Sequence, residues 1–213
     1  MGALLEIVLA GVVLVNLAML GTSRLRSCIR FVGVQGVLIG LAPALAPGWS
    51  YGLRPVALLA IAILIKGFLM PWLLLRAIRE AHVRREIEPF LGYTASVLLG
   101  AVLTAAAFGF AARLPVAAPA GPPFLPVGVA SLLAGTLLMV TRKKAVTQVI
   151  GYLVMENGIF LFGQGLGAEL PAPVEIGILL DLLVAVFVMG IAMFHINREF
   201  DSMSVHQLTE LRD

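Results

Sequence analysis

Residues 145–166 read AVTQVIGYLVMENGIFLFGQGL, and Glu156 is the one Asp, Glu, Lys or Arg in this run. A helix of this length rises about 33 Å, which is enough to cross the hydrocarbon core of a bilayer. The whole chain of 213 residues has the same character, with 60% hydrophobic residues, 13% charged residues and a mean hydropathy of +1.02. Soluble domains carry about 25% charged residues. The composition therefore excludes a water-soluble globule and predicts an all-α membrane protein.

Apolar stretches of similar length recur along the chain. They predict seven transmembrane helices, over residues 3–21, 31–46, 55–75, 90–112, 124–141, 145–166 and 173–197. The Pro- and Ala-rich residues 114–123 predict an external linker. This linker would divide an N-terminal four-helix part, residues 1–113, from a C-terminal three-helix part with a short tail, residues 124–213.

The basic residues predict the orientation of these helices. Twelve of the fifteen Lys and Arg residues follow the first, third, fifth and seventh predicted helices, whereas the opposite loops hold only Arg54 and Arg113. Cytoplasmic loops of membrane proteins hold the excess of Lys and Arg. We therefore expect the N-terminus outside and the C-terminus in the cytoplasm.

Three ionisable residues, Lys66, Glu156 and Asp181, fall near the middle of predicted helices. Such a side chain costs about 2.5–3.5 kcal/mol at the centre of a membrane helix, so it seldom persists without a partner or a task. Each lies about 12–18 Å along its helix from a membrane face, so all three share one layer near the midplane. Burial favours the neutral form of each group and an opposite charge favours the ionised form. The pattern predicts a proton relay; a buried ion pair, such as Lys66 with Asp181, that only fixes helix packing stays open.

Residues beside Lys66 predict a local break in its helix. Gly67 follows it directly, and Pro71 lacks the N–H that would bond the carbonyl of Gly67. A freed carbonyl next to a charge is a point that water can reach. A kink that serves only helix packing stays open as the alternative. In the predicted second helix, Gly36 and Gly40 have the spacing of a close-packing motif.

Polar residues near the two acids are further candidates for supporting roles. Asn157 and Gln164 make the helix around Glu156 unusually polar, and Glu175 follows Pro173 where a first-turn acid complements the helix dipole. No metal site is predicted, because the histidines lack ligand spacing and one cysteine cannot hold a cluster. The sequence predicts no cofactor of its own and no nucleic-acid partner.

Three motifs resemble the membrane subunit called hydrogenase-4 component E. They are Leu64-Ile65-Lys66-Gly67 with Pro71, the run GYLVMENG over residues 151–158, and Val174-Glu175-Ile176-Gly177 ending at Asp181. The last three helices also resemble the K-type subunit of complex I and the C subunit of multisubunit cation/proton antiporters. K-type subunits carry their first glutamate at the position of Leu153, so Glu156 lies about 4.5 Å further along the helix.

The resemblance implies a non-catalytic membrane subunit of a formate hydrogenlyase or related group 4 nickel–iron hydrogenase complex. Its expected partners are antiporter-like membrane subunits and, indirectly, peripheral [NiFe] and iron–sulfur subunits that catalyse the redox reaction. The expected location is the inner membrane of a bacterium or archaeon, where Lys66, Glu156 and Asp181 would contribute to proton or sodium translocation.

Two other classes of protein would use the same charges. A stand-alone proton-coupled transporter of small solutes would use them as substrate and proton sites. A retinal protein would use Lys66 for a Schiff base, but two Trp and three Tyr leave little for an aromatic chromophore pocket.

Overall fold

The described part of the chain is all-helical. The structure is a computed structural model that describes residues 2–47, 52–80, 89–114 and 124–166, and residues 177, 180, 181, 183, 184 and 190 of the C-terminal segment. The helices are α1 (Gly2–Gly21), α2 (Leu25–Leu41), α3 (Leu53–Leu64), α4 (Met70–Glu80), α5 (Tyr93–Ala111), α6 (Phe124–Thr141) and α7 (Ala145–Gly165). A short 3₁₀ turn, Pro43–Leu45, follows α2, and a π-helical turn, Ile65–Leu69, joins α3 to α4.

These helices form six spans that are long and apolar enough to cross a membrane. Two of the six are composite: α2 continues through the 3₁₀ turn (Leu25–Leu45), and α3 and α4 form one rod (Leu53–Arg79). The six match the first six predicted spans, so the described part is typical of a multi-pass membrane protein. The predicted seventh span, residues 173–197, lies mostly outside the described residues. Seven spans and the orientation of the termini therefore stay predictions.

The second span begins earlier than predicted. The prediction started it at Phe31, whereas α2 begins at Leu25 and includes Arg26 and Arg30. Both arginines are exposed. Hydropathy ends a predicted span at a charge, but a long side chain at a helix end keeps its charge at the polar interface without breaking the helix. The prediction of the start at Phe31 was therefore wrong by about two turns.

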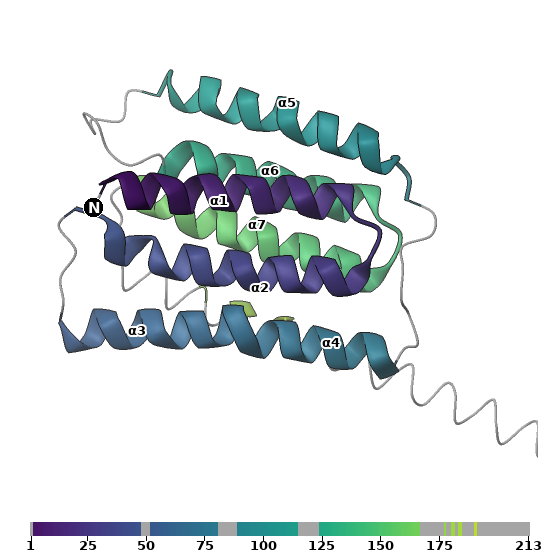
Figure 1. The fold of residues 1–213 in the computed structure, drawn as a ribbon, viewed down its shortest axis with the longest axis horizontal. Helices are drawn as coiled ribbons and strands as arrows, with labels where there is room; N and C mark the ends of the chain where they lie inside the picture. The colour runs from purple at the N-terminus through teal and green to yellow at the C-terminus, as the bar shows by residue number, and fades with distance from the viewer. Residues whose placement is uncertain are drawn as a thin grey trace, which may run out of the picture.

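The helices lie side by side in a bundle (Figure 1). The rod of α3 and α4 lies along one edge against α2, and α5 lies along the opposite edge against α1 and α6. Between these edges, α1, α2, α6 and α7 form the middle of the bundle, with α6 and α7 in the most extensive contact. This arrangement places α2 in contact with both α7 and the rod that carries Lys66.

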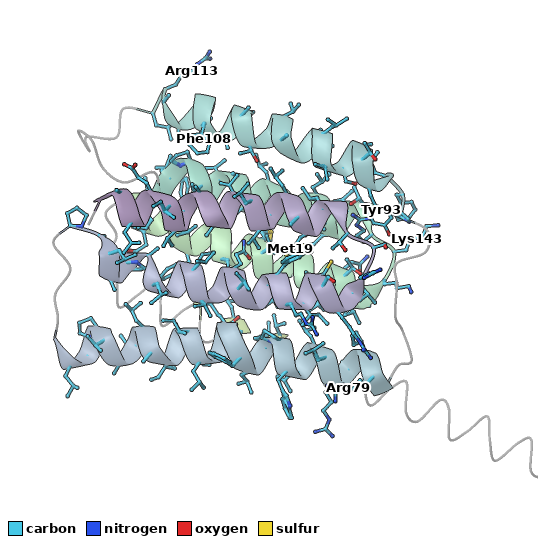
Figure 2. The ribbon with its side chains drawn as sticks, in the orientation of Figure 1. Met19, Arg79, Tyr93, Phe108, Arg113 and Lys143 are labelled. Carbon is cyan, nitrogen blue, oxygen red and sulfur yellow. The ribbon has the colours of Figure 1, made fainter. Side chains whose placement is uncertain are left out.

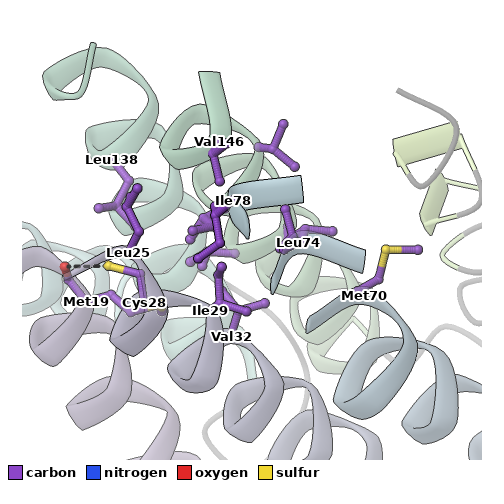
Figure 3. Close-up of a cluster of buried hydrophobic side chains, with 14 of the residues drawn as sticks. Met19, Leu25, Cys28, Ile29, Val32, Met70, Leu74, Ile78, Leu138 and Val146 are labelled. Carbon is purple, nitrogen blue, oxygen red and sulfur yellow. Dashed lines mark hydrogen bonds between the residues drawn. The ribbon is translucent and has the colours of Figure 1, made fainter. Parts of the chain in front are cut away.

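A buried apolar cluster joins helices from both ends of the sequence (Figure 3). It includes Met19 of α1, Cys28 of α2, Met70 of α4, Leu138 of α6 and Val146 of α7. The predicted N-terminal and C-terminal parts therefore pack on one another. Their division at residues 114–123 stays a prediction, because residues 115–123 lie outside the described part.

The basic residues that follow successive predicted helices lie at alternate ends of the bundle. Arg79 and Lys143 lie at one end, whereas Arg113 lies at the other (Figure 2). The first two belong to the predicted cytoplasmic side and the third to the predicted external side. The helix arrangement therefore agrees with the alternation of charge on which the orientation was predicted.

Glycines allow α6 and α7 to approach closely. A Cβ on Gly135 of α6 would lie 2.5 Å from the carbonyl oxygen of Gly151, and a Cβ on Gly158 of α7 would lie 2.5 Å from the backbone nitrogen of Leu132. These neighbours are backbone atoms, which cannot rotate away as a side chain does. No hydrophobic force drives helices together in lipid. Small residues at a helix interface let the two backbones approach, so that close van der Waals packing holds the helices together.

We predict that Gly135→Ala lowers the free energy of unfolding by about 1–3 kcal/mol, because the added methyl group forces α6 from α7. The matched control is Gly109→Ala on α5, where a Cβ meets nothing within 4 Å. This control should be neutral or more stable by up to about 1 kcal/mol, because alanine has the higher helix propensity. Circular dichroism during denaturation in detergent measures both, and equal effects would contradict the close contact.

Candidate functional site

Lys66 lies in the π-helical turn Ile65–Leu69. The N–H of Met70 donates to the carbonyl of Ile65, five residues earlier, in place of the usual four. Pro71 follows this turn and has no N–H to continue the α-helical pattern. The predicted kink at Gly67 and Pro71 is therefore a widened turn of helix, a feature that occurs frequently at functional sites.

Glycines of α2 bring that helix against the π turn. A Cβ on Gly36 would lie 2.9 Å from the carbonyl carbon and oxygen of Lys66, and a Cβ on Gly33 would lie 2.9 Å from Pro71 Cγ. On the other side of the contact, a Cβ on Gly67 would lie 2.6 Å from Cγ2 of Val37. The predicted close-packing role of Gly36 is thereby confirmed, and the backbone of Lys66 is held directly against α2.

Lys66, Glu156 and Asp181 meet in one buried ion cluster. The Lys66 Nζ donates to Glu156 Oε1 at 2.6 Å and forms an ion pair with Asp181 Oδ2 at 3.2 Å. The three residues are 7%, 3% and 0% exposed, respectively. A Cβ at position 177 would lie 3.1 Å from Glu156 Oε1, so Gly177 leaves room for this contact. The fold thus brings Lys66 to a carboxylate that lies 90 positions later in the sequence and to a second one further along the chain.

The ion cluster holds two acids and one base. If all three groups are ionised, it carries a net charge of −1 in an apolar interior. Glu156 Oε2 and Asp181 Oδ1 are buried, and neither has a hydrogen-bond partner among the residues that the structure describes. Unpaired buried carboxylate oxygens are costly. The arrangement can therefore accept a further proton, which would remove the excess charge and supply a donor.

Comparisons with known proteins place the chain in a family. It is 32% identical to hydrogenase-4 component E of Escherichia coli K12 over 155 residues, which cover 72% of this chain and 71% of that protein. The chain belongs to the hydrogenase-4 component E family. The component E of Shigella flexneri matches equally. An uncharacterized protein of Mycobacterium tuberculosis is 32% identical over 213 residues, which cover 99% of this chain and 96% of that protein. No family model and no solved structure matches the chain.

The residues predicted to have supporting roles do not lie together at the ion cluster. Asn157 is buried, and its Nδ2 donates to Gln35 Oε1 of α2 rather than to the ion cluster. Gln164 lies two turns further along α7, and its Nε2 is buried with no hydrogen-bond partner in the described part. Glu175 and the three histidines lie outside the described residues. Within the residues described, no group of three or more His, Cys, Asp or Glu side chains could hold a metal ion.

A buried chain of hydrogen-bonded, uncharged polar side chains was not predicted from the sequence. Asn16 Nδ2 donates to Ser131 Oγ at 2.9 Å, Gln35 Nε2 donates to Asn16 Oδ1 at 2.7 Å, and Asn157 Nδ2 donates to Gln35 Oε1 at 3.2 Å. We call these four residues the amide chain. They lie on α1, α6, α2 and α7 and are at most 2% exposed. An amide in the middle of an apolar span was the available signal for Asn16 and Gln35, but of the four residues only Asn157 was predicted.

Arg142 also differs from its expected role as a charge on a cytoplasmic loop. It is 1% exposed, and its Nη2 donates to the Leu20 carbonyl near the C-terminus of α1 at 2.7 Å. Its guanidinium lies over the ring of Tyr93, 4.4 Å from the ring centroid. A cation at a helix C-terminus complements the helix dipole. Arg142 therefore joins the ends of α1, α5 and α6.

We predict that Lys66→Met lowers the free energy of unfolding by about 3–5 kcal/mol, because two buried carboxylates lose their cation. Adding Glu156→Gln and Asp181→Asn to this variant should recover most of the lost stability, since no charge then remains in the ion cluster. The control is Lys143→Met, an exposed lysine whose Nζ lies 5.1 Å from the centroid of the Phe90 ring, and it should change stability by about 1 kcal/mol at most. Denaturation in detergent measures all three. An unchanged Lys66→Met variant would show that the ion cluster does not stabilise the fold.

Proposed function

We propose that this chain is a non-catalytic membrane subunit of a hydrogenase-linked assembly and that its ion cluster takes part in proton translocation. Membership of the hydrogenase-4 component E family supports the assembly, and six membrane-length helices support the location in the cell membrane. One cysteine cannot ligate nickel or an iron–sulfur cluster. Hydrogen or formate chemistry belongs to peripheral partners, and antiporter-like subunits lie beside this chain in the membrane.

The single observation that carries the proposal is the Lys66 ammonium between two buried carboxylates, at 2.6 Å from Glu156 and 3.2 Å from Asp181. A proton that binds to Glu156 cancels the attraction between that carboxylate and Nζ. The ammonium then pairs with Asp181 alone, and release of the proton restores the first pairing. Proton binding thus changes the position of a buried charge.

This movement couples a proton to its electrostatic surroundings. A charge that changes in a neighbouring subunit favours one pairing of Lys66 over the other by its different distance from the two positions. A shift of a few kcal/mol is enough to exchange the major and minor states. Redox chemistry in the peripheral subunits can therefore drive proton uptake on one side and release on the other.

The π turn suits this role because it places the moving charge on an adjustable backbone. A π turn contains one more residue than an α turn, and its hydrogen bonds can exchange with those of the α-helix. Pro71 removes one competing donor at the end of the turn. Small changes at Lys66 therefore do not require the whole rod of α3 and α4 to shift.

We predict that Glu156→Gln and Asp181→Asn each lower turnover-coupled proton translocation about tenfold or more, equal to about 1.4 kcal/mol in the barrier. The measurement is acidification of inverted membrane vesicles that contain the assembled complex. The control is Glu6→Gln, an exposed acid near the end of α1. Subunit composition should be unchanged in all variants. Normal translocation in both cluster variants would overturn the relay and leave a packing role.

Purification distinguishes the subunit from the stand-alone transporter. We expect a tagged chain to co-purify with antiporter-like and hydrogenase subunits from membranes under mild detergent. In vesicles that contain only this chain, a proton gradient should drive no solute uptake. Proton-coupled uptake by the isolated chain would overturn the proposed assembly.

A further inference from the structure

The amide chain ends beside the ion cluster without belonging to it. Asn157 follows Glu156 on α7, and Gln35 precedes Gly36 on α2. On α7, the Glu156 side chain belongs to the ion cluster and the Asn157 side chain belongs to the amide chain. On α2, Gly36 lies against the backbone of Lys66 and Gln35 against Asn157. Two helices therefore contact each other and the lysine at the same level.

We propose that Gln35 and Asn157 are positioning residues that fix the rotation of α7 so that Glu156 faces Lys66. This inference rests on the proposed function of the ion cluster in proton transfer. The Asn157–Gln35 hydrogen bond ties α7 to α2, and the Gly36 contact ties α2 to the backbone of Lys66. Together they define the distance from the lysine backbone to the Glu156 carboxylate.

Helix geometry explains why this tie controls the carboxylate. Adjacent residues of a helix are separated by about 100° around the axis. A rotation of α7 that breaks the hydrogen bond of Asn157 therefore also turns Glu156 away from Nζ. Burial makes such a rotation unfavourable, because it leaves amide groups without partners in an apolar interior.

The rest of the amide chain makes Gln35 a firm attachment point. Its Oε1 accepts from Asn157 and its Nε2 donates to Asn16 at 2.7 Å, so both ends of the side-chain amide are bonded. Asn16 in turn donates to Ser131, which connects α6. Gln35 is 0% exposed and is therefore held by packing as well as by hydrogen bonds. Rotation of its side chain would break two bonds at once.

Gln35→Met tests the proposal because methionine has a similar length and no amide. We expect turnover-coupled proton translocation to fall about tenfold or more, the scale on which small misplacements affect a positioned reaction. The matched control is Gln148→Met, an exposed glutamine on α7 outside the amide chain. It should translocate protons at the normal rate.

A spectroscopic measurement separates positioning from general loss of structure. The chain has three lysines, Lys66, Lys143 and Lys144, so ¹⁵N-lysine labelling of the full-length chain, purified and placed alone in lipid membranes, gives three side-chain signals. Lys66→Arg identifies the signal of Nζ in the ion cluster. We expect Gln35→Met to move that signal toward those of the other two lysines and Gln148→Met to leave it in place.

A double variant keeps the test valid if Gln35→Met folds poorly. In Gln35→Met with Asn157→Leu, both hydrogen-bonding partners become apolar, and stability recovers because fewer buried amides are unpaired. Translocation and the Lys66 signal should nevertheless stay altered. A normal signal and normal translocation in this stable double variant would overturn the positioning role. If Glu156→Gln translocates normally while Gln35→Met still moves the Lys66 signal, only the proposed function fails.

Discussion

An ammonium group held between two carboxylates in an apolar interior is the interaction on which the arrangement of this bundle depends. Each of the three charges alone would be strongly unfavourable in hydrocarbon. Their pairing makes burial possible only if three segments present the right faces at the same depth. Gly36 and Gly177 provide the space that this requires, one beside the lysine backbone and one beside Glu156 Oε1. The ion cluster thus constrains helix rotation as well as depth.

The ion cluster is stable in position but unbalanced in charge. One base cannot compensate two acids, and the two unpaired oxygens, Glu156 Oε2 and Asp181 Oδ1, mark the imbalance. A buried carboxylate oxygen without a partner adds to the cost of burying the ion cluster, and a bound proton would lower that cost. The excess acid is therefore the feature that supports the proposed proton exchange. In the proposed relay, the π turn at Lys66 would allow the ammonium to change its pairing as the proton binds.

Sequence reasoning reached the parts of this structure that depend on composition and helical rise. The six described spans follow from runs of apolar residues, and the common depth of Lys66, Glu156 and Asp181 follows from 1.5 Å per residue. Rotation about the helix axes was out of reach, because it depends on contacts between helices. The pairing of Glu156 with the lysine, and of its neighbour Asn157 with Gln35, depends on that rotation.

Other features escaped because they depend on local exceptions to helical rules. Pro71 indicated a break near Lys66, but the choice between a kink and a π turn depends on the packing of α2 against it. Arg142 follows a predicted span and has the sequence of a surface charge, yet the C-terminus of α1 and the ring of Tyr93 enclose it. Its burial results from neighbours that are distant in sequence, which no local pattern contains.

Charged and uncharged polar groups have different physical roles in this interior. Amide side chains do not gain or lose protons near neutral pH, so the hydrogen bonds of the amide chain persist whatever the protonation of Glu156. In the proposed relay the ion cluster, by contrast, changes its pairing when a proton binds. In this relay, the Lys66 ammonium moves in a defined direction only if the helices around it keep their positions. The amide chain joins α1, α2, α6 and α7 by hydrogen bonds that do not depend on a proton at Glu156.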